Sequence, residues 1–129
     1  MAYRVLIVDD SPVTRKIVAK AIGMSGLAVG EILQAGSGRE ALELMAASQV
    51  DLVFADINMP EMSGVEMVER MAQSPALARL PVVIISTERS QERIQRLTEL
   101  GVKAYLTKPF RPEELLRVVG ALLPAGGAA

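Results

Sequence analysis

Short apolar runs alternate with amphipathic stretches along the whole of this 129-residue chain. The clearest run is Val5-Leu6-Ile7-Val8, and its continuity is typical of a strand that is buried on both faces. A weaker run around residues 29–33 is interrupted by Gly30 and Glu31. Taken together, the pattern predicts five strands, at residues 5–8, 29–33, 52–55, 82–85 and 104–107.

The segments between these runs carry helix signals. Ser11-Pro12 is typical of an N-cap followed by a first helical residue. Capping boxes, in which a serine is followed three residues later by a glutamate, open the second and third helices; the fourth ends at Gly101 and the fifth begins at Pro112. The boxes are Ser37 with Glu40 and Ser63 with Glu66. The apolar positions expected to face inward are Val13, Ile17, Ala21 and Ile22, then Ile94, Leu97 and Leu100, then Leu115, Leu116, Val119 and Leu122.

Five strand–helix repeats with short connections predict an α/β fold, a parallel sheet with helices on both faces. The length fits one domain spanning residues 1–129. Residues 124–129 have nothing to bury, so we expect a flexible tail. Such sheets bind ligands at the carboxyl ends of their strands, and chemistry is therefore expected directly after each apolar run.

Polar side chains follow four of the five runs. Asp9 and Asp10 follow the first, Asp56 the third, Ser86 the fourth and Lys108 the fifth. Any one of them could be an ordinary turn or cap residue, but together they would converge on one edge of the sheet.

A cluster of this kind suits phosphoryl chemistry. Three neighbouring carboxylates repel one another and raise their own pKa values, a conflict that a divalent cation relieves. All the obvious ligands are oxygens, and Mg²⁺ suits a site with few protein ligands that leaves positions for water and phosphate. Aspartate can accept a covalent phosphoryl group, and Lys108 would stabilise the charge on its oxygens.

The composition narrows the classes of function. There is no cysteine and no histidine, which excludes disulfides, Cys nucleophiles, His bases and a role as phosphohistidine donor. The 14 basic and 15 acidic residues nearly balance, so nothing favours nucleic acid or an anionic membrane as a partner. We find no signal peptide and no apolar run long enough to cross a bilayer, and we expect a cytoplasmic monomer.

Three motifs resemble the receiver domains of two-component response regulators, in particular the CheY-like type. They are Val5 to Ser11, Asp56 to Gly64 and Lys108-Pro109-Phe110, and the likeness extends over about residues 3–123. The resemblance implies a flavodoxin-like sheet with strand order 2-1-3-4-5. It also implies a signalling module that catalyses only its own phosphorylation and dephosphorylation.

The resemblance assigns roles at the predicted site. Asp56 would be the phosphoacceptor and Lys108 would contact the phosphoryl group. Mg²⁺ would bind Asp10, Asp56 and the backbone carbonyl of Asn58, with Asp9 contributing through water.

Further roles concern switching and signal lifetime. Ser86 would be the switch hydroxyl, preferred over Thr87 because it ends the apolar run directly, and Tyr105 would be the switch aromatic. Asn58 and Glu88, each two residues beyond a site residue, would tune dephosphorylation.

The resemblance also implies partners. A histidine kinase would donate the phosphoryl group, and a target protein would bind the face formed by the fourth helix, fifth strand and fifth helix. Arg89, Arg93 and Arg96 lie on the fourth helix, either as a solvated stripe or as part of that docking face. The start at Met1, with no room for a DNA-binding domain, favours the stand-alone form, and chemotaxis is the first expectation for its pathway. Ile57, where such proteins often carry an aromatic residue, weakens the chemotaxis assignment, and Ser86 stands where receivers often have threonine.

Other functions stay open at this point. Within signalling, the chain could be a relay or cell-cycle receiver, or a fragment of a larger regulator. A phosphatase of the haloacid dehalogenase type also uses Mg²⁺ and an aspartate nucleophile. Its first strand, however, is followed by Asp-x-Asp, whereas Asp9-Asp10 and Asp56-Ile57-Asn58 lack that spacing of acids, and there is no cap insertion to hold a substrate.

Overall fold

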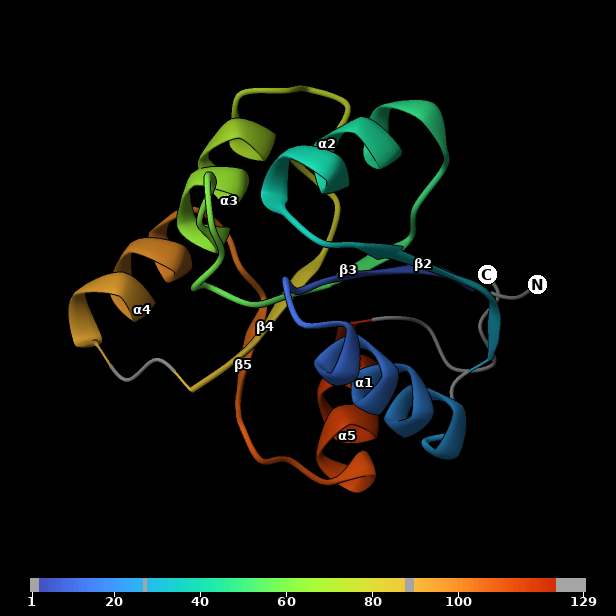
Figure 1. Ribbon diagram of the computed structural model, residues 1–129. Coiled ribbons are helices and arrows are strands. Elements are labelled where there is room, and N and C mark those ends of the chain that lie inside the picture. Colours follow the sequence, from blue (N-terminus) through green and yellow to red (C-terminus); the bar gives the residue numbers. More distant parts are fainter. Residues whose placement is uncertain (1–2, 27, 88–89, 123–129) are drawn as a thin grey trace.

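The computed structural model describes residues 3–26, 28–87 and 90–122. Within them, strands and helices alternate along the chain as predicted (Figure 1). The elements are β1 (Tyr3–Val8), α1 (Pro12–Met24), β2 (Val29–Ala35), α2 (Gly38–Ala47), β3 (Leu52–Ala55), α3 (Gly64–Ala72), β4 (Val82–Ser86), α4 (Gln91–Glu99), β5 (Ala104–Thr107) and α5 (Pro112–Leu122).

The strands form one parallel sheet in the order β2-β1-β3-β4-β5, which confirms the predicted topology. Helices α1 and α5 cover one face, and α2, α3 and α4 cover the other (Figure 1). Pairing in the sheet lengthens three strands beyond their apolar runs, since β1 starts at Tyr3, β2 continues to Ala35 and β4 includes Ser86. The predicted tail at residues 124–129 lies outside the described residues.

Alternate residues of each central strand feed two separate cores. Leu6 and Val8 of β1 pack under α2, α3 and α4, whereas Val5 and Ile7 pack under α1 and α5. Burial on both faces explains why these strands are continuously apolar. Phe54 is the largest fully buried side chain and belongs to the α1 and α5 core.

The helix-start predictions hold with one correction. Ser11 accepts a hydrogen bond from Thr14 N, and Ser63 and Glu66 make both bonds of a capping box. At α2, Ser37 accepts from Glu40 N, but the Glu40 carboxylate bonds to Gly36 N at 2.6 Å. The capping-box prediction was therefore wrong for one of its two bonds. The Glu40 carboxylate bonds to the backbone N–H of Gly36, which precedes the N-cap Ser37.

The predicted inward stripes of α1 and α5 were partly wrong. Val13 and Ile17 are 67% and 58% exposed, and the buried residues of α1 are Val18, Ala21 and Ile22. Leu116 of α5 is 42% exposed, while its neighbour Leu115 is fully buried. One residue turns a helix by about 100°, so a stripe misassigned by one position places its side chains largely outside the core.

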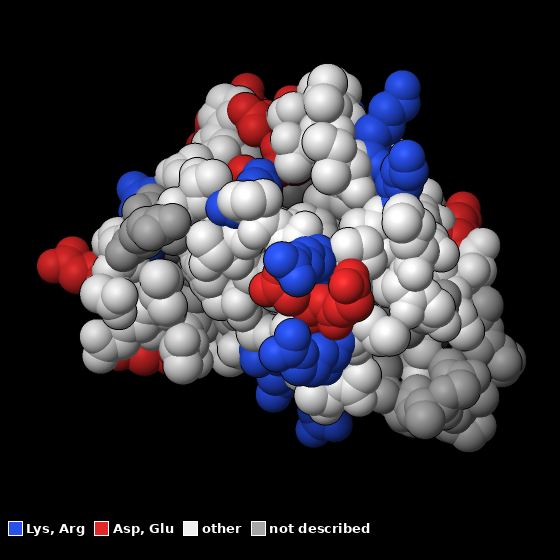
Figure 2. All heavy atoms as spheres, turned by 90° about the horizontal axis from the view of Figure 1, so that it is seen from below, with Lys and Arg blue, Asp and Glu red and all other residues white. Residues whose placement is uncertain are grey.

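The face formed by α1 and α5 is mainly uncharged at its surface. Seen from that side, basic and acidic side chains lie next to one another in a central group (Figure 2). The exposed large hydrophobic residues of the described chain, Val13, Ile17, Met24 and Leu116, belong to these two helices.

Among the described residues, no helix combines the length and the apolar character needed to cross a membrane.

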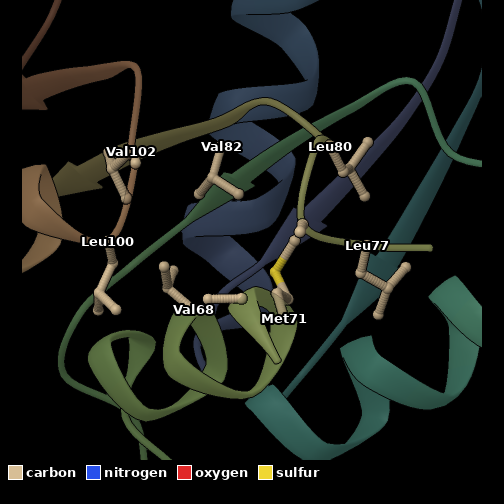
Figure 3. Close-up of a pocket in the computed structure, with 10 residues that line it drawn as sticks. Val68, Met71, Leu77, Leu80, Val82, Leu100 and Val102 are labelled. Carbon is tan, nitrogen blue, oxygen red and sulfur yellow. The ribbon is translucent and has the colours of Figure 1, made fainter. Parts of the chain in front are cut away.

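A small apolar cavity of about 20 Å³ lies at the amino-terminal edge of the sheet, where β4 begins (Figure 3). Aliphatic and methionine side chains from α3, the segment before β4 and the segment after α4 surround it: Val68, Met71, Leu77, Leu80, Val82, Leu100 and Val102. It therefore lies away from the carboxyl ends of the strands, where the predicted polar residues gather.

Candidate functional site

The neighbouring strands β1 and β3 bring the acidic residues together. Val8 pairs with Ala55 at the ends of these strands, and Asp56 N donates to Val8 O at 3.0 Å. Oxygen atoms of Asp9, Asp10 and Asp56 consequently lie within 4.8 Å of one another. Asp9 is buried, Asp56 is half-buried and Asp10 is exposed, so the cluster opens to solvent on one side.

Lys108 reaches this cluster from beyond β5. Its Nζ lies 3.0 Å from Asp9 Oδ2 and 3.2 Å from Asp56 Oδ2. Lys108 N also donates to Ser86 O at 3.1 Å, which ties the end of β5 to the end of β4. One ammonium group thus bridges two of the three carboxylates.

Ser86 completes the cluster as the last residue of β4. It is fully buried, whereas Thr87 is exposed, and its side chain hydrogen-bonds Asp56. Two backbone groups also donate to Asp56 Oδ1, Ile57 N at 2.7 Å and Asn58 N at a longer 3.4 Å. The Asp56 carboxylate is held by backbone and side-chain donors.

The environment shifts the pKa values of Asp9 and Asp56 in opposite directions. Burial raises the pKa of Asp9, and its hydrogen bonds from Ser11 N and Lys108 offset this only in part. Asp56 is also desolvated, but the Ser86 hydrogen bond and the Lys108 charge outweigh the burial and lower its pKa. Burial alone would lower the pKa of Lys108, yet Asp9 and Asp56 raise it. Asp56 is therefore anionic and Lys108 cationic at neutral pH.

Two further predicted residues, Asn58 and Tyr105, belong to the described part of the chain. Asn58 is exposed, and its Oδ1 accepts a hydrogen bond from Arg93 Nη1 at 2.8 Å. Tyr105 is half-buried in β5 opposite Ile84 and packs against the α2, α3 and α4 core. Glu88 and Arg89 lie outside the described residues.

Three neighbours of the cluster were not predicted from the sequence to lie at the site. Arg15 Nη1 donates to Asp9 O at 2.6 Å, and its Nε donates to Gln34 Oε1 at 3.0 Å, which joins α1 to the ends of β1 and β2. Gly64 N donates to Ile57 O at 2.7 Å, and the glycine lies against the Asp56 backbone. Arg93 contacts Asn58 directly. Of these, the glycine stood in the motif from Asp56 to Gly64 and Arg93 in the arginine stripe of the fourth helix, whereas Arg15 carried no signal in the sequence.

The donor set fits a hard divalent cation. The three clustered side chains offer only carboxylate oxygens, the ligands that Mg²⁺ prefers, and Asp10 is exposed and so accessible to a hydrated ion. Lys108 already neutralises part of the charge on Asp9 and Asp56. The cluster suits an ion that keeps much of its water.

The family model for the response regulator receiver domain matches residues 5–120. The chain belongs to the response regulator receiver family. This assignment decides against the haloacid dehalogenase alternative. Within the matched range, Asp9, Asp10, Asp56 and Lys108 lie together at one edge of the sheet.

Similar proteins come from plants and bacteria. The two-component response regulator ORR11 of Oryza sativa subsp. indica is 38% identical over 121 residues, which cover 93% of this receiver and 80% of the relative. The solved structure of the chemotaxis response regulator CheY4 of Vibrio cholerae is 33% identical, with a TM-score of 0.83, and covers 95% of this chain and all of that chain. A receiver protein from Pseudomonas putida, at 24% identity and a TM-score of 0.84, shares the fold.

Proposed function

We propose that this receiver accepts a phosphoryl group on Asp56 from a histidine kinase and passes the signal to a target protein. The observation that carries the proposal is the position of Lys108, whose ammonium group bridges Asp56 and Asp9 within 3.2 Å. An anionic oxygen beside a fixed cation can attack phosphorus, and the same cation then stabilises the charge on the phosphoryl oxygens.

The transfer forms one bond to phosphorus and breaks another. An Asp56 carboxylate oxygen forms a bond to phosphorus while the bond from phosphorus to the imidazole nitrogen of the donor breaks. Lys108 remains protonated throughout because its neighbours raise its pKa. Bound Mg²⁺ would be held by Asp10, Asp56 and the Asn58 carbonyl, with Asp9 acting through water, and would add positive charge beside the phosphoryl oxygens.

Phosphorylation would be read out through Ser86 and Tyr105. The phosphoryl oxygens are strong acceptors, so the Ser86 hydroxyl, which now bonds to Asp56, would donate to one of them. The resulting shift at the end of β4 would change the packing of Tyr105 in the paired strand β5. A target that prefers this altered face of α4, β5 and α5 would stabilise the phosphorylated state in return.

The specific pathway is proposed to be chemotaxis, on the likeness to CheY4 along the full length of that chain. The rice relatives are named only as two-component response regulators, and they support a relay role equally well. A relay or cell-cycle receiver, or a fragment of a larger regulator, is therefore the second candidate. In either case we propose a cytoplasmic monomer that acts on no substrate other than its own phosphoryl group.

Acetyl phosphate with Mg²⁺, followed by intact mass measurement, tests the proposal. One added phosphoryl group is expected on the wild type and none on Asp56→Asn. Asp51→Asn is the matched control, because Asp51 precedes β3 and binds Arg4 N away from the cluster. Equal labelling of Asp56→Asn, or sustained release of phosphate from unrelated phosphoesters, would contradict the assignment.

A further inference from the structure

The first turn of α4 is tied to the site by a hydrogen bond between two exposed side chains. Arg93, the third residue of α4, donates from Nη1 to Asn58 Oδ1 at 2.8 Å across 35 positions of sequence. Asn58 in turn approaches Asp56 Oδ1 through its backbone N–H at 3.4 Å. These contacts connect the output helix to the phosphoacceptor through a single residue.

Apolar packing does little to hold this turn. Leu97, in the second half of α4, is the one buried residue of that helix. A cleft of about 340 Å³ separates its beginning from α3, lined by Ser63, Val65, Glu92, Arg93 and Arg96. Within the described residues, the first turn of α4 therefore meets the site through the polar contact of Arg93 with Asn58.

The chemistry of the pair sets the orientation of Asn58. A guanidinium group can only donate hydrogen bonds, so Arg93 selects the amide oxygen of Asn58 and leaves its NH₂ group pointing elsewhere. The amide oxygen has two lone pairs, and the charge-assisted hydrogen bond from Arg93 occupies one of them and fixes the direction of the other. Arg93 thus reduces the ability of the Asn58 oxygen to orient a water molecule.

We propose that Arg93 is a positioning residue that lengthens the lifetime of phosphorylated Asp56 by holding the Asn58 side chain on the α4 side. The inference rests on the proposed function and deepens it. Hydrolysis requires a water whose oxygen forms a bond to phosphorus as the Asp56 oxygen–phosphorus bond breaks, with the water proton passing to solvent or phosphate. A released Asn58 amide would offer that water an acceptor beside its path, so releasing it should speed the step.

The chain offers a close control in Arg96. It lies one turn further along α4 and is similarly exposed, but it binds Glu69 of α3 through two N–H groups at 3.0 and 3.3 Å. Arg96→Ala therefore removes a bridge from α4 to α3 without touching Asn58. A general loosening of α4 would affect both arginine variants, whereas a specific role of Arg93 would not.

The test is the decay of phosphate from protein labelled with acetyl phosphate, measured by intact mass after removal of the donor. We expect Arg93→Ala to lose phosphate roughly two- to five-fold faster than the wild type, a size typical of an exposed charged contact. Arg93→Lys should lie between the two, and Arg96→Ala should decay like the wild type. In an Asn58→Ala background, Arg93→Ala should leave the decay rate unchanged, because no amide is left to release.

Several results would overturn the inference. They are equal or slower decay in Arg93→Ala, the same acceleration in Arg96→Ala, or an undiminished Arg93→Ala effect in the Asn58→Ala background. Failure of the proposed function itself is seen earlier and separately, as wild-type protein that takes up no phosphoryl group at all.

Discussion

Lys108 Nζ lies 3.2 Å from Asp56 Oδ2, although 52 positions separate the two residues in the sequence. The strand β4 lies between β3 and β5 in the sheet, so the lysine reaches past it from the far side. The Ser86 hydrogen bond and this contact together lower the pKa of Asp56, and Asp9 and this contact together raise the pKa of Lys108, in each case against the effect of burial.

Replacing Lys108 should slow phosphorylation without preventing folding. We expect Lys108→Met to react with acetyl phosphate about 100-fold more slowly, the typical cost of removing one preorganised group that stabilises developing charge. Lys108→Arg keeps the charge and should retain part of the rate. Lys103→Met, which changes an exposed lysine just before β5, is the control; an equal loss of rate in that variant would contradict a specific role for Lys108.

Mg²⁺ should bind the unphosphorylated protein weakly and through Asp10. The cluster offers few protein ligands, and Mg²⁺ gives up its water reluctantly. Titration followed by NMR or calorimetry should show an affinity that falls at least about 10-fold in Asp10→Asn, since the site loses a charged ligand. Asp51→Asn should bind as the wild type does. Unchanged affinity in Asp10→Asn would rule out its assignment as a ligand.

Asp9 and Asp56 should affect stability with opposite signs when no metal is bound. The folded pKa of Asp9 is raised, so its ionisation opposes folding increasingly as pH rises above the unfolded value of 3.8. The folded pKa of Asp56 is lowered, so it stabilises the fold above 3.8, and that contribution is lost as pH falls through its folded pKa.

Thermal unfolding in the presence of a chelator tests these signs. At pH 7, Asp9→Asn should raise Tm, because the variant no longer buries a charge at this position. Asp56→Asn should lower Tm. Both differences should shrink in acid, where the wild-type carboxyl groups are protonated. A lower Tm for Asp9→Asn at every pH would contradict the predicted penalty of burying its charge.

Gly64 should tolerate no side chain. A Cβ at this position would overlap the Asp56 backbone oxygen and lie 3.0 Å from Ile57 Cα, both of them backbone atoms that cannot turn aside. We expect Gly64→Ala to cost about 2 kcal/mol or more in unfolding free energy and to slow phosphorylation by displacing Asp56. Gly120→Ala, in α5 with nothing within 4 Å of the new Cβ, should instead stabilise by roughly 0.5–1 kcal/mol.

Ser86 and Tyr105 should transmit a change at the Asp56 site to the face of α4, β5 and α5. We expect beryllofluoride, which mimics the phosphoryl group, to shift NMR signals at the Asp56 site and also along residues 86–93 and 103–118. Ser86→Ala should keep the shifts near Asp56 and lose those around Tyr105, because the hydroxyl that draws β4 inward is absent. Wild-type shifts confined to the site would reject this pathway.

Much of the fold and the site follows from local sequence. Continuous apolar runs mark strands buried on both faces, and serine caps mark where the helices begin at Ser11 and Ser63. Polar residues after four of those runs, Asp56 and Lys108 among them, had to converge because parallel strands end at one edge of a sheet. The order of the strands came only through the resemblance to receiver domains, since periodicity carries no information on which strands are neighbours.

The tertiary structure decided which face of a helix packs inward and which side chains from distant segments meet. Val13 and Ile17 have the spacing of a core stripe, yet α1 packs with Val18 and Ile22 inward, because the rotation of a helix is set by the surface beneath it. The contact between Arg93 and Asn58 joins distant segments through two exposed polar side chains, which leave no trace in a hydrophobic pattern. The sequence therefore determined which groups gather at the site, and the packing of α1 and α4 determined which of their side chains reach it.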